Sequence, residues 1–164
     1  MKNLILMRHA KAEKDSVKAS DFERDLEERG KKDALFMAQL LGKTKFIPAQ
    51  IVASPANRTK QTASIVSKEL KVKNLELDSN IYEADISDLM HVLREFDDQF
   101  KQILLVGHNP SITGIVGYLT QSFVEHIPTS GIVVVELPAL TWKQIQNRTG
   151  KVLWHQSPKG LPIF

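Results

Sequence analysis

The sequence contains no cysteine, which excludes disulfide bridges, a thiol nucleophile and metal sites built on thiolates. It also has no run near the ~20 apolar residues of a membrane-spanning helix. The apolar start of the chain is interrupted by Arg8 and His9, so we expect neither a signal peptide nor a membrane partner. These absences together favour a cytoplasmic protein.

The chain also has little excess of charge of either sign. The chain has 22 lysine and arginine residues against 19 aspartate and glutamate residues, a net charge of +3. This small excess is compatible with an anionic substrate, but it does not indicate a nucleic-acid partner.

The length of 164 residues and the 42% hydrophobic content are those of an ordinary globular domain with one core. No repeat, low-complexity tract or linker rich in proline or serine interrupts the chain. We therefore expect a single domain over residues 1–164, whose oligomeric state the sequence leaves open.

Short apolar runs alternate with segments of helical periodicity, which predicts an α/β fold. We expect a three-layer α/β/α sandwich whose central sheet is mainly parallel, with an antiparallel edge strand where two late strands pair. The predicted strands are Asn3–Met7, Gln50–Ser54, Leu75–Leu77, Ile103–Val106, Ile132–Leu137 and Val152–His155, and the predicted helices run from about Asp25 to Leu41, Asn57 to Leu70, Ser87 to Phe96 and onward from Pro110.

Local signals place the first helix and the loop before it. Asp25 with Glu28 three positions later is typical of a capping box, and Gly42 is expected just beyond the end of the helix. The polar segment from Lys11 to Asp21 is predicted to be a loop of the kind that often carries function.

Conspicuous polar residues follow three of the predicted strands. Arg8 and His9 end the first, Ser54 to Arg58 follow the second, and His108 follows Val106. Taken singly, each is more simply a surface residue, a turn or a cap. Ligands of parallel sheets bind beyond the carboxyl ends of the strands, so we expect these residues to meet at one edge.

Two histidines and two arginines at one edge suit phosphoryl chemistry. Guanidinium groups bind phosphate oxygens through paired hydrogen bonds, and a neutral imidazole can attack phosphorus. Arg58 at a helix start, where the helix dipole disfavours a cation, is explained if it shares an anion with that helix. The sequence shows no metal-ligand spacing, so no metal and no cofactor are expected.

The motifs, in their order, resemble the histidine phosphatase superfamily, also called the phosphoglycerate mutase-like superfamily. Short length and two further segments make the chain most similar to the SixA-type phosphohistidine phosphatases. The resemblance runs from about Asn3 to Leu137 and is carried by Leu6-Met7-Arg8-His9-Ala10-Lys11, Ser54-Pro55-Ala56-Asn57-Arg58-Thr59-Lys60-Gln61-Thr62, Tyr82-Glu83-Ala84, Val106-Gly107-His108-Asn109-Pro110 and Pro128-Thr129-Ser130-Gly131.

The resemblance implies that His9 is the phosphorylated nucleophile. It implies also that Arg8 and Arg58 clamp the phosphate and that His108 is the second histidine of the pocket. The chain departs from the family pattern at Asp25, where relatives commonly have proline.

Four further residues complete the expected site. Glu83 lies in the segment that supplies a proton-donating carboxylate in the family, although it equally suits the first turn of a helix. Asn109 and Ser130 are expected to donate hydrogen bonds to phosphate or to His108, with capping and turn formation as the alternatives. Lys11 is expected to add positive charge at the pocket mouth, with a solvated surface lysine as the alternative.

The predicted function is a metal-independent phosphatase with a phosphohistidine enzyme intermediate, acting on phosphohistidine in a protein. The first alternative is a small-molecule phosphomonoesterase or a phosphoglycerate-mutase-like enzyme, whose substrate would be a small phosphorylated metabolite. The second alternative, of another class, is a noncatalytic phosphate-binding module. A mutase fits less well, because it needs a closed pocket and the sequence offers no obvious extended lid.

Overall fold

The computed structural model describes residues 1–14, 20–160 and 162–164. Part of the loop predicted between Lys11 and Asp21, at positions 15–19, therefore lies outside the described residues. Within these ranges one six-stranded sheet has the strand order β3-β2-β4-β1-β5-β6. The strands are β1 (Lys2–Arg8), β2 (Gln50–Ala53), β3 (Leu75–Leu77), β4 (Gln102–Gly107), β5 (Ile132–Leu137) and β6 (Lys151–Gln156).

Most of the sheet is parallel. β1 pairs in parallel with β4, β4 with β2, and β2 with β3. β5 pairs antiparallel with both β1 and β6. The predicted α/β fold with a mainly parallel sheet is confirmed, and the two late strands pair antiparallel at its edge. In detail, β6 is the edge strand, and the strand that runs against all the others is β5, one position inside it.

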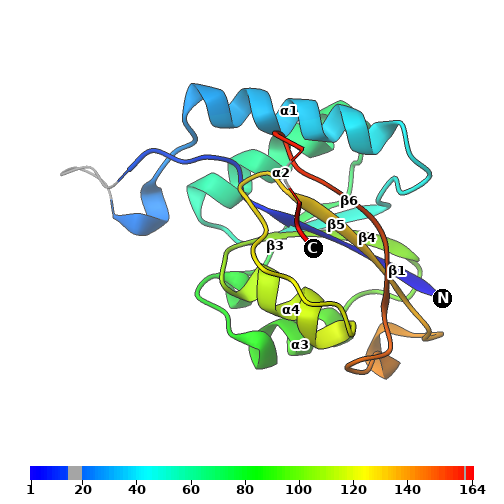
Figure 1. Ribbon diagram of the computed structural model, residues 1–164. Coiled ribbons are helices and arrows are strands. Elements are labelled where there is room, and N and C mark those ends of the chain that lie inside the picture. The colour runs from blue at the N-terminus through cyan, green and yellow to red at the C-terminus, as the bar shows by residue number, and fades with distance from the viewer. Residues whose placement is uncertain (15–19, 161) are drawn as a thin grey trace.

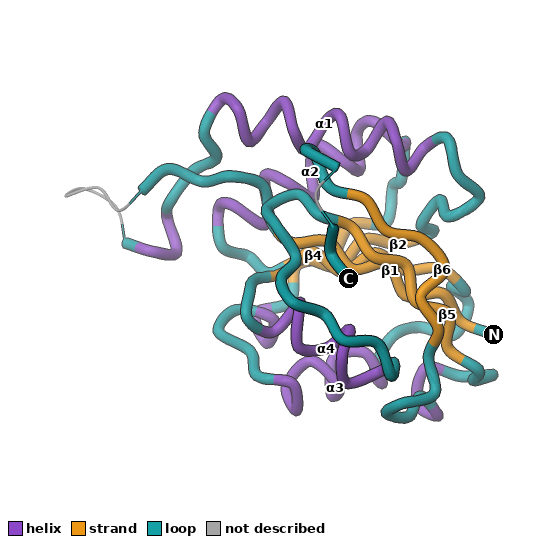
Figure 2. The backbone as a smooth tube through the Cα atoms, in the orientation of Figure 1, coloured by secondary structure: helices purple, strands orange, loops and turns teal. Residues whose placement is uncertain are grey.

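Helices cover both faces of this sheet, which makes the predicted three layers (Figures 1 and 2). α1 (Glu28–Gly42) and α2 (Asn57–Leu70) lie on one face, and α3 (Ile86–Arg94) and α4 (Ser111–Leu119) lie on the other. None of the helices within the described ranges is long and apolar enough to cross a bilayer.

The alternation of side chains along β1 explains why the sheet is buried on both faces. Ile5 and Met7 belong to the core cluster that includes residues of α1 and α2, whereas Leu4 and Leu6 belong to the cluster on the side of α3 and α4. All four are 0% exposed. A continuous apolar run is what a parallel strand between two helical layers requires, and the charged residues Arg8 and His9 begin where that run leaves the core.

The predicted start of the first helix is wrong. α1 begins at Glu28 after Glu27, which makes no side-chain capping bond, and Gly42 is its last residue rather than the residue beyond it. Asp25 does not cap the helix, because its carboxylate accepts hydrogen bonds from Asn57 Nδ2 at 3.1 Å and Gln61 Nε2 at 2.8 Å. Asp25 therefore fastens the segment before α1 to the first turns of α2.

Candidate active site

The carboxyl ends of β1 and β4 bring the two histidines together. His9 directly follows Arg8, the last residue of β1, and His108 follows Gly107, the last residue of β4. The backbone N–H of His9 donates to the carbonyl of Gly107 at 3.0 Å, and the two ring centroids lie 5.5 Å apart. The convergence expected from the strand ends is therefore present at these two residues, both of which are nearly buried.

A backbone carbonyl fixes the orientation of the His9 ring. Nδ1 lies 2.8 Å from the carbonyl oxygen of Ala10. A carbonyl can only accept, so Nδ1 carries the proton in the neutral ring and Nε2 keeps its lone pair. Burial and then the nearby positive charges lower the pKa of His9 to about 3, despite the opposing effect of the Ala10 bond. The ring is therefore neutral near pH 7.

Ser54, at the end of β2, holds the ring of His108. The Ser54 hydroxyl lies 2.8 Å from His108 Nε2 and accepts a bond from the N–H of Ala56 at 3.3 Å. The hydroxyl can donate to Nε2, and in that arrangement the proton of the neutral ring is on Nδ1. Burial, followed by the charge of Arg58, lowers the pKa of His108 to about 4. Nδ1 is buried and has no hydrogen-bond partner.

The two arginines enter from different elements, and the protein holds terminal nitrogens of each guanidinium. Arg8 Nη1 donates to the carbonyl of Ile127 at 3.2 Å and lies 3.2 Å from His126 Nε2. Arg58, in the first turn of α2, donates from Nη1 and Nη2 to the carbonyl and carboxylate of Asp21. Burial and the charge of Arg58 lower the pKa of Arg8. Two like charges, one buried and one partly buried, that act on each other in this way favour a shared anion.

Ser130 joins the site through the loop before β5. Its backbone N–H donates to the carbonyls of Arg8 and His9 at 3.1 and 3.2 Å, and its φ of 62° turns the chain at that point. Its hydroxyl is buried without a partner, as are Nε of Arg8, Nε of Arg58 and Nδ1 of His108. Buried polar groups are nearly always paired, so four unpaired ones on neighbouring residues suit an anion with several acceptor oxygens.

Three of the predicted site residues have other surroundings. Lys11 is exposed, and its ammonium group lies 3.7 Å from the carboxylate of Glu27. The side chain of Asn109 bonds within the protein: Nδ2 donates to the carbonyl of Ile127, and Oδ1 accepts from Thr113 in α4. The bond from Thr113 is of the capping kind, although Pro110 is the residue directly before α4.

Glu83 lies outside the helix that follows it. It has a φ of 55°, is exposed, and lies before α3, which is capped instead by Asp85. Its carboxylate makes none of the hydrogen bonds or ion pairs found among the described residues. Glu83 is therefore not a first-turn residue of the helix.

Two residues of the site were missed by the sequence reasoning. Asp21 contacts Arg58, and its carboxylate accepts the Tyr82 hydroxyl at 2.8 Å. The ring of Tyr82 meets the ring of His108 edge-on at 5.5 Å. Asp21 lies in a polar segment with no periodicity, so its charge was the only signal that could have indicated it. Tyr82 lies beside Glu83 in a segment that the sequence analysis had already noted.

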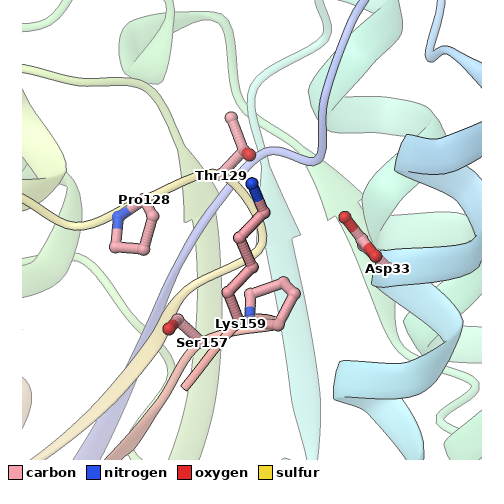
Figure 3. A pocket seen from close by; sticks show the side chains of 6 residues that line it. Asp33, Pro128, Thr129, Ser157 and Lys159 are labelled. Atoms are coloured by element: carbon pink, nitrogen blue, oxygen red, sulfur yellow. The ribbon is translucent and has the colours of Figure 1, made fainter. Parts of the chain in front are cut away.

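A separate pocket of about 120 Å³ lies beside the site and does not contain the histidines. Figure 3 shows Thr129 and Pro128 on one side, Ser157 and Lys159 from the C-terminal turn, and Asp33 facing them from α1. No group of three or more histidine, aspartate or glutamate side chains among the residues that the structure describes is arranged to hold a metal ion.

The fold and the edge residues together define an α/β protein with a candidate phosphate site at the carboxyl ends of its parallel strands. The family description of the histidine phosphatase superfamily (branch 1) matches residues 4–101. The chain belongs to this superfamily, and this membership supports a phosphatase activity.

Solved structures show the same fold. The histidine phosphatase SixA in complex with tungstate has a TM-score of 0.82 and 24% identity, over 96% of this chain and 97% of that one. SixA of Agrobacterium tumefaciens has a TM-score of 0.80 and 22% identity, over 96% and 98%. A mycobacterial glucosyl-3-phosphoglycerate phosphatase has a TM-score of 0.65 and 14% identity, over 92% and 96%.

Proposed function

We propose that the protein is a metal-independent phosphatase in which His9 is the nucleophile. The observation that carries this proposal is the orientation of the His9 ring, whose Nδ1 lies 2.8 Å from the Ala10 carbonyl. Nε2 is therefore unprotonated, in a ring that burial keeps neutral. A neutral imidazole nitrogen of this kind can attack phosphorus and split the transfer into two easier steps.

The other polar groups have complementary roles in this proposal. Nε of Arg8, Nε of Arg58 and the hydroxyl of Ser130, all buried without partners, donate to the equatorial oxygens of the phosphoryl group. The Nδ1 proton of His108 donates to the same group and stabilises charge as the bond to the leaving group breaks. Binding of a dianion also relieves the repulsion between the two arginines.

The reaction proceeds in two balanced steps. His9 Nε2 forms a bond to phosphorus while the bond between phosphorus and the leaving group breaks, and the leaving group takes up a proton. Water then attacks the phosphohistidine, restores the neutral His9 ring and releases inorganic phosphate. Neither step requires a metal, so a chelator is expected to leave the rate unchanged.

We further propose that the substrate is a protein phosphorylated on histidine. The likeness to proteins described as SixA phosphohistidine phosphatases supports this class. The exposure of Glu83, whose carboxylate is bound to no other described residue, supports it as well. An alkoxide leaving group needs strong acid assistance, whereas the nitrogen of a phosphoramidate departs readily once it is protonated, and solvent can supply that proton.

A small phosphorylated metabolite is the second candidate substrate. The likeness to a glucosyl-3-phosphoglycerate phosphatase favours it. The same nucleophile and arginine pair would act in both cases, so the two substrates differ in leaving group rather than in the site.

The deciding experiment compares the hydrolysis of a histidine-phosphorylated protein with that of p-nitrophenyl phosphate and 3-phosphoglycerate, using wild type and His9→Ala. We expect a higher kcat/KM for the phosphohistidine protein. We expect His9→Ala to lower kcat by about 10⁴-fold or more, because the nucleophile is lost. An acid-labile phosphoryl label should be trapped on the wild type alone.

The matched control is His91→Ala, which removes an exposed histidine of α3 and should leave kcat unchanged. Circular dichroism checks that His9→Ala remains folded. Turnover by folded His9→Ala would contradict the nucleophile, and preference for 3-phosphoglycerate would replace the protein substrate. Phosphate binding by the wild type without turnover would establish a noncatalytic module.

A further inference from the structure

Asp21 places a carboxylate against the arginine of the phosphate site. Oδ2 accepts from Arg58 Nη2 at 3.1 Å and from the Tyr82 hydroxyl at 2.8 Å, and Oδ1 accepts from Arg24 Nη1 at 3.2 Å. The carbonyl oxygen of Asp21 accepts from Arg58 Nη1 at 2.8 Å. The Tyr82 bond is the main cause that lowers the pKa of Asp21, so the carboxylate is ionised near pH 7.

The segment that carries Asp21 is docked on the helix that carries Arg58. Asn57 Nδ2 donates to the carbonyl of Glu23 at 3.0 Å and to the carboxylate of Asp25 at 3.1 Å. Gln61 adds a bond from Nε2 to Asp25 at 2.8 Å. Asp21 therefore belongs to a short 3₁₀ turn (Asp21–Glu23) held in a fixed place relative to α2.

Arg58 is held through both terminal nitrogens, and Arg8 through one. Both terminal nitrogens of Arg58 donate to Asp21, while its Nε is buried without a partner. Arg8 donates from Nη1 to the carbonyl of Ile127, and its Nε is likewise unpartnered. In each guanidinium, terminal nitrogens donate hydrogen bonds to the protein and the Nε–H donates none. A planar guanidinium tied along one edge cannot rotate, so its remaining donors keep a fixed direction.

We propose that Asp21 is a positioning residue for Arg58: it ties the terminal nitrogens of the guanidinium so that Nε–H and the remaining donors face the phosphoryl group during transfer. This role rests on the proposed phosphatase function. Tyr82 extends it, because its hydroxyl bonds the Asp21 carboxylate while its ring packs edge-on against His108. One carboxylate thus links the phosphate arginine to the second histidine.

Two other roles for Asp21 fit the contacts less well. A proton donor would have to carry a proton, whereas a carboxylate that accepts bonds from Arg58, Arg24 and Tyr82 is ionised. An anion that blocks the phosphate site would bond all the donors that phosphate uses. Asp21 leaves the Nε of Arg58 without a partner, so it does not occupy the site in this way.

The test measures kcat and the inhibition constant of inorganic phosphate for Asp21→Ala, Asp21→Asn and Glu23→Gln. Asp21→Ala should lower kcat by about 10- to 100-fold, because the guanidinium loses its direction in the transition state. Phosphate should bind as tightly as before or more tightly, because removal of a carboxylate leaves the site more positive. Asp21→Asn should be partly rescued, because it keeps an acceptor oxygen.

Glu23→Gln is the matched control, because it removes the same charge from the same 3₁₀ turn while its carboxylate contacts Ser20. It should leave both constants unchanged. Local unfolding would weaken phosphate binding together with kcat, so a loss of phosphate affinity above about tenfold contradicts positioning. A rise in kcat/KM for Asp21→Ala would show a blocking anion, and an unchanged kcat would show no role.

An NMR measurement tests the positioning role of Asp21 independently of whether the protein is a phosphatase. The Nε–H signal of Arg58, assigned with Arg58→Lys, should exchange slowly with solvent in the wild type. Asp21→Ala should speed that exchange and leave the Arg8 signal unchanged. This result would support the contact even in a protein without turnover, whereas equal exchange in both proteins would refute it.

Discussion

The orientation of His108 depends on one hydroxyl group at the end of β2. Ser54 is 0% exposed, and its hydroxyl lies 2.8 Å from Nε2 of the ring. Without this hydroxyl, Nε2 is buried and unpaired, and the tautomer with the proton on Nδ1 is no longer favoured. Groups that orient an active-site imidazole decide its tautomer, so Ser54 should matter for the rate although it does not touch the substrate.

We therefore expect Ser54→Ala to lower kcat by about fivefold, with a smaller change in KM, because one neutral hydrogen bond is worth about 1 kcal/mol. Steady-state kinetics across pH 5.5–8.5 provide the measurement. Ser64→Ala, an exposed position of α2, is the control and should match the wild type. If Ser54→Ala keeps the wild-type kcat, the hydroxyl does not set the His108 tautomer.

At this scale the sequence could predict the residues that stand directly at strand ends and in the family motifs. Arg8, His9 and His108 needed only the boundaries of β1 and β4 and the rule about carboxyl ends. Ser130 was expected from its family motif alone, and Asp21 could not be placed at all, because its position depends on a loop. The expectation that Arg58 shares an anion with the start of α2 stays a prediction, and the structure adds a contact that the sequence did not predict, between Arg58 and the carboxylate of Asp21.

At the scale of elements, α1 is packed against the loop that follows His9. The backbone N–H of Glu27 donates to the carbonyl of Lys11 at 2.9 Å. A Cβ at Gly30 would overlap the carbonyl oxygen of Lys11 and lie 3.0 Å from its backbone N and C. Only glycine allows the helix to approach the segment two residues after His9 so closely.

Gly30→Ala should consequently destabilise the protein by about 1–3 kcal/mol, as overpacking does, and should lower kcat because the backbone beside His9 must move. Alanine ordinarily stabilises a helix interior by about 1 kcal/mol relative to glycine. Gly117→Ala in α4 is the matched control, because the nearest atom to its Cβ would lie 4.0 Å away. Urea denaturation should show opposite signs for the two variants, and equal effects would contradict the close approach.

Element types were predicted better than element ends. The predicted helix from Asn57 to Leu70 and strand from Leu75 to Leu77 agree with α2 and β3. The start of α1 failed because the pattern around Asp25 looks like a local cap. Its carboxylate instead bonds Asn57 and Gln61, which are more than 30 positions away in the chain. A local rule cannot detect such a distant competitor.

For the whole molecule, the sequence could predict the layers but not the complete order of strands. Alternating apolar runs and amphipathic helices require a sheet covered on both faces. The insertion of β5 between β1 and β6 depends on which edge the late strands join, and their apolar residues suit either edge. The position of β5 matters for the site, because the loop before it carries Ser130.

The buried histidines also make the stability of the whole molecule depend on pH. The pKa values of His9 and His108 are lowered to about 3 and about 4, below the ordinary value of 6.5. Between about pH 6.5 and pH 4 the unfolded chain therefore binds protons that the folded chain does not. The free energy of unfolding must fall as the pH falls through this range and change little above it.

Urea denaturation at pH 7.5, 6.0 and 5.0 tests this dependence. Each histidine should contribute a slope approaching about 1.4 kcal/mol per pH unit at the acidic end of the range. His108→Gln should remove about half of the slope that the two histidines share, whatever its effect on the stability at pH 7.5. His91→Gln, on the exposed side of α3, should keep the full slope. If His108→Gln and the wild type lose stability equally between pH 6.0 and 5.0, His108 is not neutral in the folded protein, and its assignment as a neutral donor from Nδ1 must be abandoned.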